Sequence, residues 1–288
     1  MGLLILTLRV GRGLTCRCLR GPHPAILSAM CEAPTVEFHA LSRPHGASAD
    51  LGESDIHVWR ARLEVPRAGL RKLERTLTQG ERERIINLAS EVDRRRATAS
   101  RGLLRNILAG YVERPAAELA FTYGPAGKPE MSAAGRGEPL HFNSTHSGDV
   151  FLVAVGRVPS LGIDVERIRP VARFERVARR AFSEEERRRI DALRPAERND
   201  AFITCWTRKE ACVKAVGEGV WSAFGRFEVS LEPDASAAVL TVDGDSAAAA
   251  EWSLYHIEPA EGYVGALAVR GVGWRVSGGT LDSSEMET

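Results

Sequence analysis

The chain has 288 residues, of which 44% are hydrophobic and 27% are charged, and its formal net charge is +1. This length suffices for one large or two small domains with a buried core, and the composition is that of a globular protein. The near-neutral charge argues against a nucleic-acid binder, and no apolar run reaches the ~20 residues that span a bilayer. Any attraction for phosphate groups must therefore come from local clusters of charge.

Residues 1–50 are expected to form an N-terminal extension without ordered structure. Their apolar stretch at residues 3–8 is short, and arginines follow it, whereas a secretory signal carries its positive charges in front. The five cysteines show neither a disulfide-scaffold spacing nor a Cys-x-x-Cys pair, which favours a reducing compartment. We therefore expect a cytoplasmic protein in which Cys205 and Cys212 are packing residues.

Residues 51–158 are expected to form an N-terminal half. Alternating side chains predict a strand at residues 56–63, and Pro66 opens a helix with leucines at helical spacing. A second helix is predicted over residues 93–112, and the stretch 124–137, rich in Gly, Pro and Ala, is expected to be a loop. Strands at residues 140–143 and 150–155 flank a turn and predict a hairpin.

Residues 159–275 are expected to form a C-terminal half with a similar order of elements, and residues 276–288 a disordered tail. A strand at 161–165 precedes helical segments over 171–193, where Ser183 and Glu186 have capping-box spacing. Pro195 opens the longest helix, which ends near residue 216. Strands are predicted at 226–231, 238–242, 251–257 and 263–269. Two halves with helices on strands predict an α+β fold with a groove between them.

Two carboxylates share one face of the strand that begins the second half. Asp164 and Glu166 are two residues apart and project to the same side, whereas Ile163 and Val165 face the other way. Such carboxylates repel each other unless a cation lies between them, and Mg²⁺ prefers carboxylate oxygens. The alternative is an exposed strand face that carries two acids without a ligand.

A second cluster lies on the longest helix, where Trp206, Glu210 and Lys214 share a face at four-residue spacing. An exposed Glu210–Lys214 ion pair explains the two charges but not the aromatic residue. A partly buried face requires partners for both charges, and a metal ion and a phosphate group are candidates.

Two further segments offer phosphate-binding groups. His146 and Ser147 end a strand at a turn, where hydroxyl and imidazole groups suit an oxyanion, although a turn or core histidine is the alternative. Arginines 94, 95, 96, 101 and 105 lie on the predicted helix over residues 93–112, as a solvated face or as a phosphate site.

Taken together, these segments resemble the double signature of the surfactin-type (Sfp-like) 4′-phosphopantetheinyl transferase family over roughly residues 55–270. The strand Gly162-Ile163-Asp164-Val165-Glu166 is followed about forty residues later by Trp206-Thr207-x-Lys209-Glu210-Ala211-x-x-Lys214. Gly127-Lys128-Pro129, Phe142-Asn143-x-x-His146-Ser147 and Phe182-Ser183-x-x-Glu186 are similar to further motifs of that family, although Thr145 stands where serine is common. The resemblance implies two similar α/β halves about a pseudo-twofold axis, with the active site in the cleft between them, and a monomeric pseudo-dimer.

The resemblance also implies an activity. The protein would transfer the 4′-phosphopantetheine moiety of coenzyme A to a serine of an apo acyl or peptidyl carrier protein, with Mg²⁺ as cofactor and adenosine 3′,5′-bisphosphate as by-product. The implied metal ligands are Asp164, Glu166 and Glu210, and the implied catalytic residues are Glu210, Asp164 and Lys214. The implied coenzyme A contacts are Arg84, Arg101, Lys128, His146, Ser147, Lys209 and Lys214. The alternative is a non-catalytic homologue of the same fold that binds carrier proteins or nucleotides.

Overall fold

The computed structural model describes residues 9–10, 14–15, 35–39, 51–124, 127–131, 139–217, 223–232 and 236–281. The described helices are α1 (Arg67–Arg75), α2 (Gln79–Ile86), α3 (Glu91–Val112), η2 (Ala116–Glu118), α4 (Phe174–Ala181), α5 (Glu184–Ala192), α6 (Pro195–Val216), η3 (Phe224–Arg226) and α8 (Ser246–Ala249). The described strands are β1 (Arg9–Val10), β2 (Leu14–Thr15), β3 (Phe38–His39), β4 (Asp55–Arg62), β5 (Phe121–Tyr123), β6 (Pro129–Met131), β7 (His141–Ser147), β8 (Val150–Gly156), β9 (Leu161–Arg167), β10 (Phe227–Val229), β11 (Val239–Val242), β12 (Trp252–Ile257), β13 (Tyr263–Arg270) and β14 (Arg275–Leu281).

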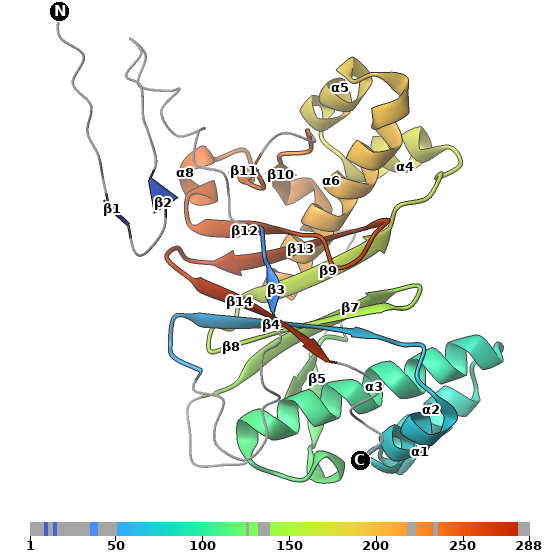
Figure 1. Ribbon diagram of the computed structural model, residues 1–288. Helices are drawn as coiled ribbons and strands as arrows, with labels where there is room; N and C mark the ends of the chain where they lie inside the picture. Colours follow the sequence, from blue (N-terminus) through green and yellow to red (C-terminus); the bar gives the residue numbers. More distant parts are fainter. Residues whose placement is uncertain are drawn as a thin grey trace, which may run out of the picture.

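Two sheets form the centre of this α+β fold. The larger has the strand order β3-β14-β4-β8-β7, and the smaller has the order β12-β13-β9. Within the larger sheet β14 runs parallel to both β3 and β4, and the remaining pairings of the two sheets are antiparallel. In Figure 1, α1, α2 and α3 lie below the larger sheet, and α4, α5 and α6 lie above the smaller one. The fold therefore has four layers, with the two sheets in the middle.

Alternating side chains divide the interior between these layers. On β8, Val153 is buried with Leu103 and Leu108 of α3, whereas Leu152 is buried with Ile163 of β9 between the two sheets. Successive strand residues point to opposite faces, so a strand with two covered faces reads as a continuous apolar run. This explains why β8 is buried along its whole length.

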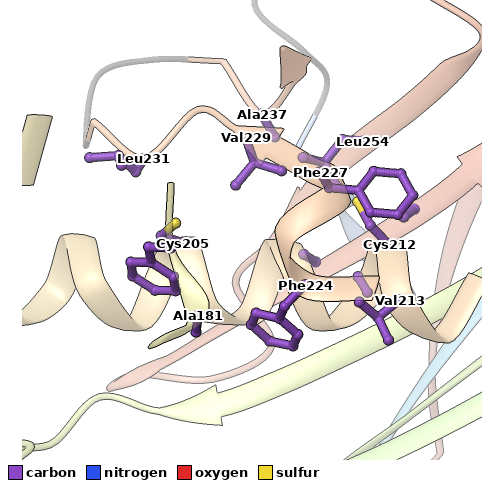
Figure 2. Packing of buried hydrophobic residues seen from close by; sticks show 14 of the residues in the cluster. Ala181, Cys205, Cys212, Val213, Phe224, Phe227, Val229, Leu231, Ala237 and Leu254 are labelled. Carbon is purple, nitrogen blue, oxygen red and sulfur yellow. The ribbon is translucent and has the colours of Figure 1, made fainter. Parts of the chain in front are cut away.

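A third core fills the space around α6. Figure 2 shows Cys212 and Val213 of this helix close to Phe224, Phe227 and Leu254. Cys205 is buried in the same core, so the expectation that Cys205 and Cys212 are packing residues is confirmed. Within the described part of the chain, no helix combines the length and the apolar character needed to cross a bilayer.

The helices with the clearest periodicity are found as predicted. The helix expected over residues 93–112 is α3, and the longest expected helix is α6, with Pro195 at its first position. The capping box of Ser183 and Glu186 at the start of α5 is also present, with hydrogen bonds in both directions. The predicted hairpin is β7–β8, in which Gly148 has a φ of 54° at the turn.

The prediction of a disordered tail over residues 276–288 is wrong for residues 276–281, which belong to β14. Its two glycines and its serine give little hydrophobic alternation, and pairing with β4 over seven residues stabilises the strand instead. The expected disorder of residues 1–50 is likewise wrong for residues 36–39, because Val36 is buried and Phe38 pairs with β14. The expected loop over residues 124–137 contains β6, which pairs with β5. Most of residues 1–50 and all of 282–288 lie outside the described residues, and the pseudo-twofold relation stays a prediction.

Candidate active site

The two sheets meet where β7 runs beside β9, and side chains join them there. Three residues on one face of β7, each two positions apart, contact β9. Asn143 Oδ1 accepts a hydrogen bond from the backbone N–H of Ile163 at 3.0 Å. Thr145 donates to Asp164 Oδ1 at 3.0 Å, and Ser147 donates to Glu166 Oε2 at 2.9 Å. Both carboxylates of β9 are therefore held by hydroxyl groups from the other sheet.

Helix α6 approaches β9 unusually closely at Gly162. A Cβ atom on this residue would lie 2.1 Å from the carbonyl oxygen of Ala211 and 2.4 Å from the backbone nitrogen of Ala215. Only glycine permits such an approach of helix backbone to strand backbone. Because Glu210 and Lys214 precede these two contact points by one residue each, the close approach brings them to the face of β9 that carries Asp164.

Lys214 is bound to the strand carboxylate. Its Nζ atom donates to Asp164 Oδ1 at 2.6 Å and to Thr145 Oγ1 at 3.3 Å. The expected alternative, an ion pair between Glu210 and Lys214 along the helix, is replaced by this link between helix and strand. The second oxygen, Asp164 Oδ2, is buried and has no hydrogen-bond partner among the described residues. A buried carboxylate oxygen in this state is costly, so this atom is suited to receive a cation.

Glu210 and Glu166 complete a cluster of three carboxylates. Burial, together with the charges of Asp164 and Glu166, raises the pKa of Glu210 to about 7 against the opposing effect of Lys214. Burial also raises the pKa of Glu166, followed by the charge of Asp164, against the hydrogen bond from Ser147. The three carboxylates are therefore within electrostatic range of one another. As they stand, no three or more Asp, Glu, His or Cys side chains in the described ranges are arranged to hold a metal ion.

His146 stands between Thr145 and Ser147 on β7, so its exposed side chain leaves the strand on the face opposite to theirs. Partial burial of the ring lowers the pKa of His146, the charges of Arg96 and Lys214 lower it further, and Asp93 opposes these effects. Arg96 itself binds Asp149 at 2.7 Å. From the residues that the sequence singled out, the structure thus brings together Asp164, Glu166, Glu210, Lys214 and Ser147, whereas His146 lies on the opposite face of β7 from Ser147.

Lys209 is not part of this group, and its expected place among the coenzyme A contacts is corrected. Its side chain is 0% exposed, and its Nζ atom donates to Glu186 Oε2 at 2.7 Å and to the carbonyl oxygen of Phe227 at 2.6 Å. Glu186 in turn accepts from the backbone N–H of Val229. The ammonium group therefore joins α6 to α5 and β10 inside the core, where no phosphate reaches it.

Lys128 is also engaged by protein groups. Its Nζ atom donates at 3.0 Å to the carbonyl oxygens of Leu161 and Lys214. Burial lowers the pKa of Lys128, and Glu130 opposes this effect. Lys128 therefore links the segment before β6 to the start of β9 and to the end of α6.

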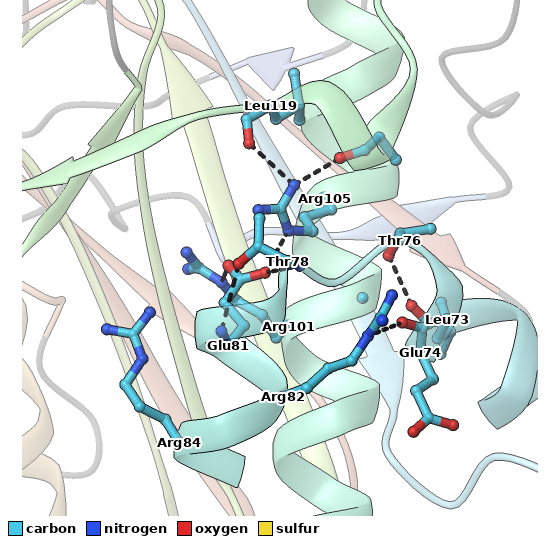
Figure 3. Close-up of polar contacts among 12 residues, drawn as sticks. Leu73, Glu74, Thr76, Thr78, Glu81, Arg82, Arg84, Arg101, Arg105 and Leu119 are labelled. Atoms are coloured by element: carbon cyan, nitrogen blue, oxygen red, sulfur yellow. Dashed lines mark hydrogen bonds and ion pairs between the residues drawn. The ribbon is translucent and has the colours of Figure 1, made fainter.

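The two expected adenosine-side arginines lie apart from the carboxylates, on α2 and α3. Figure 3 shows Arg101 and Arg105 of α3 directed at Glu81 of α2, a buried carboxylate that each of them binds. Arg101 also donates to the hydroxyl of Tyr123 at 3.0 Å. Arg84 is exposed and donates to the same hydroxyl at 3.3 Å. The basic face of α3 is therefore partly structural.

The structural roles of three residues were not predicted from the sequence: Asn143, Glu81 and Gly162. Asn143 belongs to a quoted motif, but its backbone partner on another strand has no signal in a single sequence. Glu81 lies three residues after Thr78, and this capping-box spacing was available. Gly162 within an otherwise apolar strand was itself a signal of close backbone approach.

Comparison with known proteins identifies the relatives of this chain. The family model described as "4′-phosphopantetheinyl transferase superfamily" matches residues 160–268, and the one described as "4′-phosphopantetheinyl transferase, N-terminal" matches residues 66–157. The 4′-phosphopantetheinyl transferase HetI of Nostoc sp. is 34% identical over 81% of this chain and 94% of its own length. A 4′-phosphopantetheinyl transferase of Bacillus subtilis is 30% identical over 60% of this chain and 80% of its own length. For psf-1 of Bacillus pumilus these values are 31%, 59% and 69%.

Proposed function

Since this chain belongs to the 4′-phosphopantetheinyl transferase family, we propose that it transfers the 4′-phosphopantetheine moiety of coenzyme A to a carrier protein. The acceptor is a serine hydroxyl of an apo acyl or peptidyl carrier protein. The serine oxygen forms a bond to the β-phosphorus of coenzyme A. The bond from that phosphorus to the bridging oxygen breaks, and adenosine 3′,5′-bisphosphate leaves with the bond electrons.

The observation that carries this proposal is the convergence of three carboxylates and one ammonium group at the contact of β9 with α6. Phosphoryl transfer needs positioning of the reactants and neutralisation of charge more than covalent participation of the protein. The ammonium group of Lys214 supplies positive charge there, and a cation held by the carboxylates would add to it. Lys214 is 28% exposed, so its ammonium is able to reach a ligand.

The oxygen donors of the same carboxylates are chemically suited to a magnesium ion, and the side chains would have to turn towards a common point to bind it. Asp164 Oδ2 is a buried acceptor without a partner among the described residues, and the raised pKa values of Glu166 and Glu210 mark carboxylates whose negative charge lacks compensation. Mg²⁺ commonly takes one or two protein carboxylates and fills its shell with water and phosphate oxygens. Asp164, Glu166 and Glu210 would hold it. When bound, the ion would offset negative charge on the diphosphate.

Glu210 is our candidate for the group that accepts the proton of the carrier serine. A carboxylate with a pKa of about 7 takes up a proton near neutral pH more readily than an ordinary one. Lys214 and His146 are proposed to contact the phosphates of coenzyme A. Ser147 orients Glu166 through its hydrogen bond.

The adenosine end of coenzyme A is proposed to lie towards α2 and the β5–β6 turn. Arg84 is exposed there and is the better candidate for the 3′-phosphate. Arg101 shares its charge with Glu81, and Lys128 is held by carbonyl groups, so both are proposed to shape this region and to contact the ligand secondarily.

The activity is tested by incubating the purified protein with Mg²⁺, coenzyme A and a panel of apo-carrier proteins, followed by intact mass measurement. We expect one phosphopantetheine mass to be added to at least one carrier. Asp164→Ala should abolish this transfer, and Lys214→Ala should weaken coenzyme A binding, whereas Asp191→Ala on the exposed side of α5 serves as control. No mass gain with any carrier would favour a non-catalytic binding protein, and full activity of Asp164→Ala would reject the assigned metal ligand.

A further inference from the structure

A cavity of 790 Å³ opens at the end of the space between the two sheets. It is lined by the last residues of β4 and β14, by the end of β9, and by the turns that precede β8 and β13. Figure 1 shows the β7–β8 and β12–β13 turns on the same side of the molecule, to the right in this view. Three arginines, Arg60, Arg62 and Arg167, contribute to the lining, and we call this cavity the arginine pocket.

The positive charge of the arginine pocket is not balanced by the protein around it. Arg60 donates to the carbonyl oxygen of Pro259 at 2.8 Å and to Thr280 Oγ1 at 3.1 Å, both of which are uncharged. Among the residues that the structure describes, no hydrogen bond or ion pair engages the guanidinium groups of Arg62 and Arg167. Burial lowers the pKa of Arg60, and the neighbouring charge of Arg62 lowers it further. Arg60 and Arg62 lie two residues apart on one face of β4 and therefore repel each other.

Two acidic residues also line the pocket, and they do not cancel this charge. Asp149 is bound by Arg96 at 2.7 Å, so its charge is already compensated. Glu261 is exposed and is the remaining carboxylate of the lining. Three arginines against one free carboxylate leave a local charge of about +2, in a protein whose net charge is +1. Unpaired cations gathered around a cavity favour an anionic ligand.

The arginine pocket is directly connected to the carboxylate cluster. The backbone N–H of Arg167 donates to Ser147 Oγ at 3.2 Å, and the same hydroxyl donates to Glu166 Oε2. Arg167 follows Glu166 in β9, and their side chains point to opposite faces of the strand. A ligand seated in the pocket is thus one strand thickness from the proposed site of transfer.

Two features favour a protein ligand over a free small anion. Arg62 and Arg167 are exposed, as in the polar rim of a protein interface, whereas a pocket for a small anion would enclose its cations. The proposed transferase must in any case seat a protein beside Glu166. We propose that the arginine pocket binds acidic side chains of the carrier protein and thereby directs its serine towards the carboxylate cluster. This inference rests on the proposed function.

The test compares three proteins: the wild type, the double variant Arg62→Glu/Arg167→Glu, and the control Arg71→Glu. Arg71 is an exposed residue of α1, which covers the other face of the larger sheet. Steady-state transfer is measured with a recombinant apo acyl carrier protein and a recombinant apo peptidyl carrier protein. Thermal unfolding of all three proteins checks that they are folded.

We expect the double variant to raise the KM for the carrier about tenfold, because charge reversal places like charges at the contact. The KM for coenzyme A should change by less than about twofold, and the effect on the carrier should shrink between about 50 mM and about 500 mM NaCl, where screening is stronger. The control should match the wild type. An unchanged carrier KM, or a rise that salt does not reduce, would reject the proposal. A parallel rise in the KM for coenzyme A would make the pocket a small-anion site instead.

Failure of the proposed function is recognised separately, because the wild type would then modify no carrier. In that case the apo acyl carrier protein is titrated directly onto immobilised wild-type and double-variant protein. A dissociation constant about tenfold weaker for the double variant would still support an acidic protein ligand. Equal affinities, or no binding to the wild type, would reject it.

Discussion

Replacement of Gly162 by alanine tests the contact on which the carboxylate cluster depends. The added methyl group would stand 2.1 Å from the carbonyl oxygen of Ala211, and real Cβ atoms almost never come within 3.0 Å of another atom. Both contact atoms belong to the backbone of α6, so no side chain is able to rotate away. The helix must instead move from β9 by at least the difference of 0.9 Å, carrying Glu210 and Lys214 with it.

The size of the effect follows from this displacement. Overpacking of a core by one methyl group typically costs about 1–3 kcal/mol in the free energy of unfolding. For a protein of this size each kcal/mol lowers Tm by roughly 2–4 °C, so we expect a loss of roughly 2–12 °C, with a middle value of about 6 °C. Activity should suffer more, because a 1 Å misplacement of a catalytic group is able to cost about a hundredfold in rate.

The assay for Gly162→Ala combines thermal unfolding with carrier modification followed by mass. Gly225→Ala in η3 is the matched control, since a Cβ atom there meets nothing within 4 Å. We expect the control to behave like the wild type in both measurements. A Gly162→Ala protein with wild-type Tm and wild-type kcat/KM would refute the close packing of α6 on β9. Loss of stability without loss of activity would refute the link between this packing and the site.

Two further predictions concern buried charges. Lys209→Met leaves Glu186 buried without its cation, so the free energy of unfolding, measured with urea, should fall by about 3–5 kcal/mol. The folded fraction of this variant should bind coenzyme A like the wild type. A variant with wild-type stability and weakened coenzyme A binding would contradict the core position of Lys209. Burial alone would raise the pKa of Glu81, but the hydrogen bonds from Arg105, the Thr78 backbone and Arg101 outweigh it and lower the pKa below 4.5. A lowered pKa adds stability above the unfolded-state value, and this stability is lost as the pH falls through the folded-state pKa. The difference in unfolding free energy between wild type and Glu81→Gln should therefore stay constant from about pH 7 to about pH 5 and narrow as the pH falls further through the lowered folded-state pKa of Glu81. A difference that stays constant below about pH 5 would count against the ion-pair network.

The sequence predicts well those parts of the molecule that local pattern determines. Helix α3 and helix α6 have long apolar stripes, and the β7–β8 hairpin has a turn with glycine between two apolar runs. The grouping of Asp164 with Glu166 on one strand face likewise follows from a two-residue period. That Glu210 joins them depends on a contact between elements almost fifty residues apart, which only the resemblance supplied.

The helical spacing around Lys209 indicates a core position, but the family resemblance favoured a contact with coenzyme A instead. Cys205 and Cys212 lie four residues before it and three after it, so the three share one stripe of α6. Because both cysteines were expected to pack in the core, a residue on the same stripe should also have been expected there. The partner of its charge, Glu186, is twenty-three residues away on α5 and has no signal at helical spacing. Strand β14 is the opposite case, because its residues lack a strand pattern and are ordered by pairing across the fold.

The position of β14 has a consequence for dissecting this protein. The strand follows all the elements of the second half, yet it is hydrogen-bonded between β3 and β4 in the sheet of the first half. A fragment ending near Pro159 would lack β14, which pairs with β4. The backbone groups along that edge of β4 would then be unpaired, and exposed strand edges promote aggregation. The complementary fragment would carry a strand with no sheet to join. Because the last strand of the chain completes the sheet of the first half, we expect neither half to fold when it is produced alone.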